Sequence, residues 1–352
     1  MEKNRNTRLL SLDGGGIRGI ITASILAALE DRLNENYRKK TGKEPKRHLR
    51  LAQFFDLLAG TSTGGILTCA LLAPHPDDKT YPKYSAHEAV DLYLKNGQFI
   101  FTKATSARIP MGTAFYGAKY KGTNMNAILL KYFGELRMSD LIKPCLITSY
   151  DIEKRKAVFF TQHDAIKKGR MYDFFVRDVT RSTSAAPTFF PPGSAKSEND
   201  LIYHTIDGGL FANNPTMCAV IESLKLFGEG DKLLNPSDMF ILSIGTGTIN
   251  KQYKHGKAEN WGIVSWLTPI IDIMMSAVSE TVDYQLKKLY DSINRKEQYI
   301  RIMPDLYTAD SGMDNVSDEN LNNLYQAGLT NAMRFEDTLD KVAGILLEGY
   351  EE

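Results

Sequence analysis

The chain has 352 residues, of which 43% are hydrophobic and 24% charged, and these proportions are typical of a soluble globular protein. A formal net charge of +1 argues against a strong whole-molecule field, so we expect no nucleic-acid polymer among its partners. Its three cysteines are widely spaced and form no CxxC or Cys/His cluster, which argues against a disulfide framework and a zinc site and favours the cytoplasm. No apolar run approaches the roughly 20 residues that span a bilayer, so we expect no integral membrane segment.

Two strand–turn–helix units stand near the start of the chain. We expect a strand at 8–12, a glycine-rich loop and a helix from Ile17 to about Leu33, then a buried strand at 54–59, a turn at Ser62 and a helix to Leu72. This repeated pattern predicts an α/β fold with a mostly parallel sheet and helices on both faces. Further strands are expected at 143–150, 156–161 and 239–244, with a shorter strand ending at Asp207.

The predicted strands place one α/β core at 8–250. Residues 74–123 have the composition of an insertion into that core, with a helix expected at 86–97. Helices expected at 261–292 and 318–348 make residues 251–352 a helical extension that packs on the core or serves as a lid or an oligomer contact.

The string Gly60-Thr61-Ser62-Thr63-Gly64 fits G-x-S-x-G and lies between an apolar strand and an apolar helix. When a chain turns from strand to helix at one residue, that residue is strained and its neighbours two positions away must be small. The helix start also directs a positive dipole at the serine. We therefore predict that Ser62 is a nucleophile and that Gly60 and Gly64 form its turn. The alternative is a serine without a catalytic role in a glycine-rich turn.

The loop Gly14-Gly15-Gly16-Ile17-Arg18-Gly19 follows a strand and opens a helix, so it also satisfies G-x-G-x-x-G. A dinucleotide-binding enzyme would need an acidic residue at the end of the next strand, and the acids at that distance lie in or just after the first helix. Successive glycines instead allow backbone N–H groups to approach a substrate closely, which favours an oxyanion hole.

A serine nucleophile needs a base, and the histidines are poor candidates for it. Five lie in polar, loop-like surroundings, and His204 on an alternating strand would face away from Asp207. A direct Ser–Asp dyad is therefore favoured over a triad. Among the aspartates near strand ends, Asp207 leads because a polar turn follows it, whereas Asp13 belongs to the glycine loop and is expected to brace it.

These strings together resemble the patatin-like phospholipase family. The resemblance rests on residues 13–19, 60–64 and 207–209, and it extends through 181–192, 213–215 and 242–247 in the family's order. It implies a three-layer α/β/α fold and a Ca²⁺-independent acyl hydrolase that requires no cofactor. In that interpretation Ser62 is the nucleophile, Asp207 is the general base, and the oxyanion is held by Gly14, Gly15, Gly16 and Arg18.

The overall length is also similar to phospholipase effectors of bacterial anti-phage systems, which implies activation by a cyclic dinucleotide. Membrane glycerophospholipids are then the expected partners, with a homodimer as an open alternative and peripheral association with the inner face of the membrane. A catalytically idle binding or storage protein and a dinucleotide-binding enzyme remain alternatives.

Both tryptophans lie in the apolar stretch 261–275, where Asp272 is the one charged residue. Such a stretch suits membrane insertion, but a core or dimer-interface helix is its more usual role.

Overall fold

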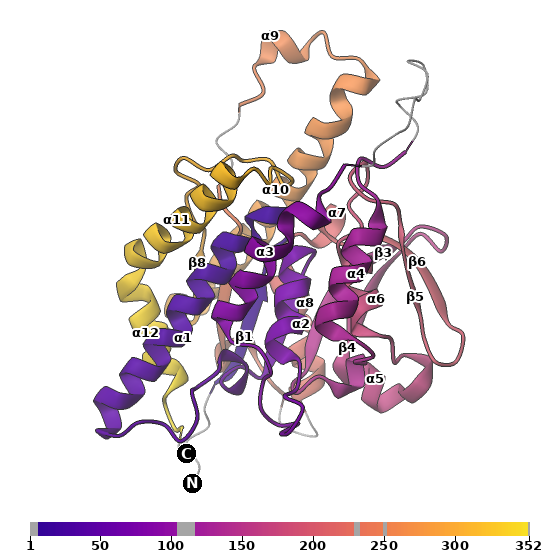
Figure 1. The fold of residues 1–352 in the computed structure, drawn as a ribbon. Helices are drawn as coiled ribbons and strands as arrows, with labels where there is room; N and C mark the ends of the chain where they lie inside the picture. Colours follow the sequence, from indigo (N-terminus) through magenta and orange to yellow (C-terminus); the bar gives the residue numbers. More distant parts are fainter. Residues whose placement is uncertain (1–5, 104–116, 229–232, 249–251, 351–352) are drawn as a thin grey trace.

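The structure is a computed structural model that describes residues 6–103, 117–228, 233–248 and 252–350. Within these residues an eight-stranded sheet runs through the centre of the molecule, in the order β5-β6-β3-β2-β1-β7-β8, with β4 paired to β3 (Figure 1). The strands are β1 Thr7–Leu12, β2 Leu57–Gly60, β3 Cys145–Asp151, β4 Lys156–Thr161, β5 Gly193–Lys196, β6 Ile202–Asp207, β7 Met239–Ile244 and β8 Tyr299–Ile302.

The central strands of the sheet are parallel, and the strands that join it beyond β3 are antiparallel. β1 pairs in parallel with β2 and β7, β2 with β3, and β7 with β8. The strands β4, β5 and β6 join the sheet through antiparallel pairings. The predicted α/β fold with a mostly parallel sheet is therefore confirmed.

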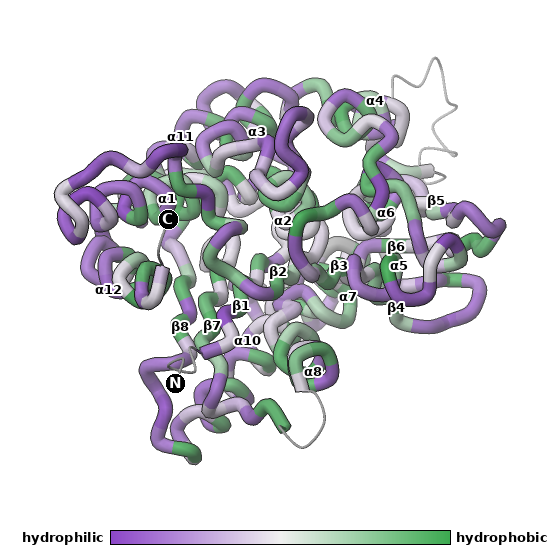
Figure 2. The backbone as a smooth tube through the Cα atoms, turned by 90° about the horizontal axis from the view of Figure 1, so that it is seen from below, coloured by the Kyte–Doolittle hydropathy of each residue, from purple (hydrophilic) through white to green (hydrophobic). Residues whose placement is uncertain are grey.

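Helices cover both faces of the sheet, and the alternation of side chains along the central strands explains why. Leu10 and Leu12 of β1 point into one large core. Leu9, which directly precedes Leu10, packs into a second core on the opposite face of the sheet. Parallel strands buried on both faces are apolar at successive positions for this reason. Figure 2 shows the resulting three layers, with the sheet between two groups of helices.

The larger helical layer contains α1, α2, α3, α4, α6, α11 and α12, and the smaller one contains α8 and the second half of α10. The helices are α1 Gly19–Thr41, α2 Thr63–Leu72, α3 Ala86–Ile100, α4 Gly122–Phe133, α5 Gln162–Lys168, α6 Val176–Thr183, α7 Gly209–Ala212, α8 Thr216–Phe227, α9 His255–Ala258, α10 Ile263–Ser292, α11 Asp318–Arg334 and α12 Glu336–Leu346. In the described residues no helix is both long and apolar enough to cross a membrane.

Several predicted elements differ from those observed. The second strand begins at Leu57 rather than residue 54, because Leu51–Gln53 form a 3₁₀ turn that places Phe54 and Phe55 in the larger core. The single helix expected at 318–348 is two helices, α11 and α12, which separate at Phe335.

The segment beyond residue 250 is not purely helical. It contributes β8, which pairs with β7 from Ile241–Tyr299 to Ile244–Ile302, so the sheet crosses the predicted boundary of the core. In the predicted insertion 74–123, α3 agrees with the helix expected at 86–97, and residues 104–116 lie outside the described residues. Leu92 and Tyr93 of α3 are buried in the larger core, so this part of the segment is integral to the fold.

Candidate active site

Ser62 lies at the sharp turn between β2 and α2. Its backbone has φ 54° and ψ −121°, a conformation that a non-glycine residue adopts only under strain. The turn is held from outside, because the Ser62 N–H donates a 2.8 Å hydrogen bond to Oγ1 of Thr183 in α6. This is the backbone geometry expected of a nucleophile placed between a strand and a helix.

The two glycines of the turn are required by close backbone approach. A Cβ atom on Gly60 would lie 2.2 Å from the carbonyl oxygen of Gly64, and one on Gly64 would lie 2.2 Å from the carbonyl oxygen of Leu12. Both distances are far inside van der Waals contact. The steric argument made from the G-x-S-x-G spacing therefore applies to this turn. The absence of a side chain at Gly64 also allows the turn to pack closely on the end of β1.

Asp207, the last residue of β6, lies opposite the serine. Ser62 Oγ donates a 2.6 Å hydrogen bond to Asp207 Oδ2, and the Gly209 N–H donates a 2.7 Å bond to Oδ1 of the same carboxylate. Both side chains are buried, with Ser62 6% and Asp207 3% exposed. Residues 145 positions apart in the chain thus form a direct serine–carboxylate pair.

Burial raises the pKa of Asp207 from its usual value of 3.8 to about 6, while the hydrogen bonds from Ser62 and Gly209 act in the opposite direction. Desolvation is the larger effect because the ionised carboxylate loses its hydration and gains only two donors. Near neutral pH the carboxylate is ionised and more basic than one on the surface, which suits it to accept a proton from the serine hydroxyl.

The dyad opens into an apolar cavity. Gly16 and Thr63 line it beside Ser62 and Asp207, and the remaining lining comes mainly from α3, α4 and the segment around Phe189. The large apolar side chains around it are Ile17, Ile66, Leu92, Tyr93, Ile100, Phe101, Met125, Ile128, Leu129, Phe189, Phe190, Met275 and Met313. No histidine is among the described residues that line it, and such a lining suits a hydrocarbon chain.

The glycine loop, residues 14–19, packs against the dyad from the end of β1. A Cβ atom on Gly14 would lie 3.2 Å from Cβ of Ser62, so this loop passes close to the serine. The N–H of Gly14 is engaged, because it donates to the carbonyl oxygen of Asn213 at 3.1 Å. For Gly15 and Gly16 no acceptor of their N–H groups is found within the described part of the chain, and Gly16, at φ 61°, lines the cavity.

Arg18 supports the glycine loop and does not line the cavity of the dyad. Its Nε donates to the carbonyl oxygen of Gly15 at 3.2 Å, and its side chain borders a separate polar cavity together with Asp272. Burial lowers the pKa of Arg18 to about 10, and the nearby Asp272 carboxylate opposes that shift. Its position in the structure is that of a positioning residue for the loop.

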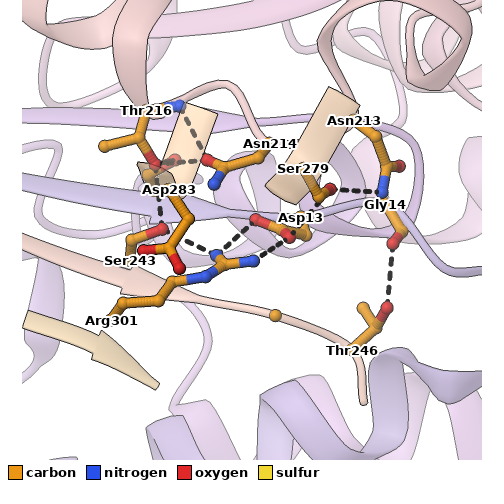
Figure 3. Close-up of polar contacts among 12 residues, drawn as sticks. Asp13, Gly14, Asn213, Asn214, Thr216, Ser243, Thr246, Ser279, Asp283 and Arg301 are labelled. Atoms are coloured by element: carbon orange, nitrogen blue, oxygen red, sulfur yellow. Dashed lines mark hydrogen bonds and ion pairs between the residues drawn. The ribbon is translucent and has the colours of Figure 1, made fainter. Parts of the chain in front are cut away.

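Asp13 braces the same loop through an ion pair with Arg301, a residue that no sequence motif indicated. Arg301 of β8 donates from Nη1 to Asp13 Oδ1 at 2.8 Å and from Nη2 to Asp13 Oδ2 at 2.5 Å, and both residues are 3% exposed as side chains. Figure 3 shows this pair together with Thr246, whose hydroxyl donates to the Gly14 carbonyl oxygen at 2.9 Å, and Ser279, which accepts from Asn213. Arg301 was missed because β8 carries no family motif.

Other chemistry suggested by residue type is not assembled in the described residues. No group of three or more His, Cys, Asp and Glu side chains among them is arranged to hold a metal ion. Cys69, Cys145 and Cys218 are all free thiols, and burial raises the pKa of each above its ordinary value.

The fold and the site together define an α/β protein whose serine, on a strained strand-to-helix turn, is hydrogen-bonded to a buried aspartate beside an apolar cavity. Residues 10–220 match the patatin-like phospholipase family, and this segment contains the glycine loop, Ser62 and Asp207. The chain belongs to that family, and this membership supports lipid acyl hydrolase activity.

The relatives extend over most of the chain. It is 35% identical to Patatin-like protein 1 of Arabidopsis thaliana over 91% of this chain and 80% of the relative. It is 33% identical to Patatin-like protein 2 of Oryza sativa subsp. indica over 93% of this chain and 84% of the relative. A potato protein from Solanum tuberosum, named Probable inactive patatin-3-Kuras 1, is 31% identical over 91% of this chain and 84% of its own length.

Gly64→Ala tests the close approach of the turn to β1. The added methyl group would force the Leu12 carbonyl away, and overpacking of this kind costs about 1–3 kcal/mol. We expect a lower melting temperature and a loss of ester hydrolysis, measured by thermal unfolding and with a water-soluble ester. Gly344→Ala in α12 is the matched control, because apart from its own helix backbone no atom lies within 4 Å of the added Cβ. Equal behaviour of the two variants would contradict the steric argument.

Proposed function

We propose that the chain is a phospholipase A-type acyl hydrolase that cleaves fatty-acyl esters of membrane glycerophospholipids through Ser62 and Asp207. The observation that carries this proposal is the 2.6 Å hydrogen bond from Ser62 Oγ to the buried Asp207 carboxylate, next to an apolar cavity. Family membership supports the class of reaction, and the geometry supports the assignment of the two residues.

The first half of the reaction forms an acyl-enzyme. Asp207 Oδ2 accepts the hydroxyl proton while Ser62 Oγ attacks the ester carbonyl carbon, and negative charge develops on the carbonyl oxygen. The N–H groups of Gly15 and Gly16 are the donors proposed for that oxygen, because the Gly14 N–H is bonded to Asn213. When the ester C–O bond breaks, the proton passes from Asp207 to the departing alcohol.

The second half reverses these roles. Asp207 accepts a proton from a water molecule whose oxygen attacks the acyl carbon. When the bond from the acyl carbon to Ser62 Oγ breaks, Asp207 returns the proton to that oxygen, and the fatty acid is released. The positive end of α2, which begins at Thr63, favours the developing negative charge in both halves. The substrate's hydrocarbon chain lies in the apolar cavity, where burial of each CH₂ group contributes about 0.8 kcal/mol to binding.

Two alternative functions make different predictions. A catalytically idle storage or binding protein, of the kind suggested by the name of the inactive potato relative, would show no serine-dependent hydrolysis. A dinucleotide-binding enzyme would need an acidic residue at the end of the strand after the glycine loop, and β2 ends at Gly60 before Thr61 and Ser62.

Activation by a cyclic dinucleotide, a role in anti-phage defence and peripheral association with the inner membrane face stay predictions from the resemblance described above. Release of fatty acid from phospholipid by the purified protein, with and without a panel of cyclic nucleotides, tests the activation.

Ser62→Ala and Asp207→Asn are each expected to lower the rate of ester hydrolysis about 10³-fold or more, because residues that act as a unit fail together. The measurement is fatty-acid release from phosphatidylcholine vesicles. Ser194→Ala on β5 and Asp200→Asn are matched controls, since both residues are exposed and lie outside the cavity. Hydrolysis that persists in Asp207→Asn would overturn the assignment of the base.

The rate of hydrolysis is expected to fall on the acid side of about pH 6, the pKa of buried Asp207. Only the ionised carboxylate can accept the serine proton, so kcat/KM should drop about tenfold per pH unit below that value. An ordinary carboxyl would place the same decline near its usual pKa of 3.8. The profile is measured with a neutral, soluble ester while circular dichroism monitors folding, and a flat rate down to pH 4.5 would exclude this role of Asp207.

A further inference from the structure

The first half of α10 projects away from the body of the molecule, with α9 at its tip (Figure 1). It leaves the body at the end where β1 leads into the glycine loop and β2 into Ser62, which is the end that contains the candidate active site. Of the two usual roles expected for the stretch 261–275, a core helix is wrong for most of its large apolar residues, because they are exposed, whereas a dimer-interface helix stays a prediction.

The exposed residues form one face of the helix. Successive members are one or three positions apart, and the pairs three, four and seven positions apart place all six on the same side of α10. The exposed fractions are 86% for Ile263, 39% for Trp266, 47% for Leu267, 46% for Ile270, and 41% for both Ile273 and Met274. Large exposed apolar patches on a folded protein mark a site of interaction with a partner or a membrane. We call these six residues the apolar face of α10.

The buried side of the same helix reaches the catalytic cavity. Ile271 and Met275 are 9% and 7% exposed, and Met275 lines the cavity that contains Ser62 and Asp207. Met275 follows directly after Met274, the last residue of the apolar face. One helix therefore carries an outward apolar face that adjoins the wall of a cavity suited to hydrocarbon.

The residues that flank the apolar face carry charges of both signs. Asp272 does not belong to the apolar face, and its carboxylate accepts a 2.8 Å hydrogen bond from the Tyr253 hydroxyl. The segment Lys254-His255-Gly256-Lys257, which leads into α9 and forms most of it, has two lysines in its sequence, and His255 Nδ1 lies 3.1 Å from the carboxylate of Glu259. Apolar and tryptophan side chains with adjacent lysines are typical of helices that lie in the interface of a bilayer.

We propose that α9 and the first half of α10 dock on the surface of a lipid bilayer, with the apolar face of α10 inserted among the acyl chains. Lys254 contacts the lipid phosphates, and Met275 places the inserted helix next to the catalytic cavity. The consequence for catalysis rests on the proposed function, whereas binding to the bilayer does not.

The tryptophans provide a direct test. Trp261 and Trp266 are the only two tryptophans in the chain, and their rings meet edge to face with centroids 4.9 Å apart, so tryptophan emission reports on this segment alone. The Ser62→Ala protein, which leaves the lipid intact, is mixed with vesicles of equal parts phosphatidylcholine and phosphatidylglycerol. We expect a blue shift of the emission and quenching by acyl chains brominated near the glycerol end.

Variants establish which surface binds. Leu267→Glu combined with Ile270→Glu should lower vesicle affinity about tenfold or more. Each change replaces an apolar side chain that we expect to insert into the bilayer by a charged one. Ile221→Glu combined with Met333→Glu is the matched control, since these residues are 58% and 66% exposed on α8 and α11. In the Ser62→Ala background the control should bind vesicles like its parent, and with Ser62 intact it should hydrolyse a soluble ester like the wild-type protein.

The outcomes separate this proposal from the proposed function. Quenching without hydrolysis of any ester by the wild-type protein would support the docking surface and refute the acyl hydrolase. Hydrolysis of vesicle lipid with no change in tryptophan emission would refute the docking surface alone. A blue shift that depends on protein concentration without vesicles, together with a dimer in light scattering, would identify a second copy as the occupant and overturn the proposal.

Discussion

The candidate active site depends on one buried hydrogen bond, from Ser62 to Asp207. Ser62 and Asp207 meet at 2.6 Å beside a lining that is almost entirely hydrocarbon, and the carboxylate has Gly209 as its other donor. Burial makes the carboxylate a stronger base than a surface aspartate, and the two hydrogen bonds fix which oxygen faces the serine. A base tuned in this way can act on the hydroxyl directly, so the geometry requires no histidine between them.

The rest of the structure holds that contact against strain and desolvation. The turn at Ser62 keeps its unfavourable backbone angles because Gly60 and Gly64 allow it to pack on the end of β1 and because Thr183 accepts the serine N–H. The glycine loop is held from behind by the buried ion pair of Asp13 with Arg301. A buried pair of this kind adds little net stability, but removal of one partner is costly, so the pair fixes the loop in one position.

The apolar parts of the molecule suit the lipid substrate that we propose. The cavity is walled mainly by α3, α4 and Met275 of α10, and each of these lies outside the central strands that position the dyad. In this arrangement the sheet positions Ser62 and Asp207, and the surrounding helices line the apolar cavity proposed for the acyl chain of the lipid. The projecting half of α10 extends the same apolar character to the outer surface, where we propose that the bilayer is met.

Features that depend on local sterics and periodicity could be predicted from the amino-acid sequence. The spacing of Gly60, Ser62 and Gly64 predicts the nucleophile turn because the side chains that would collide are two positions apart, and the apolar runs at 8–12 and 239–244 predict central strands because both of their faces are buried. It also indicated Ser62 and Asp207 as partners, through the elimination of the histidines and the family resemblance. Contacts between distant segments could not be predicted in this way. They include the pairing of β8 with the sheet, which brings Arg301 to Asp13, the place of Arg18 at a second cavity, and the exposure of the apolar face of α10. An apolar pattern states that a face avoids water, but which surface covers that face is set by how the whole chain packs.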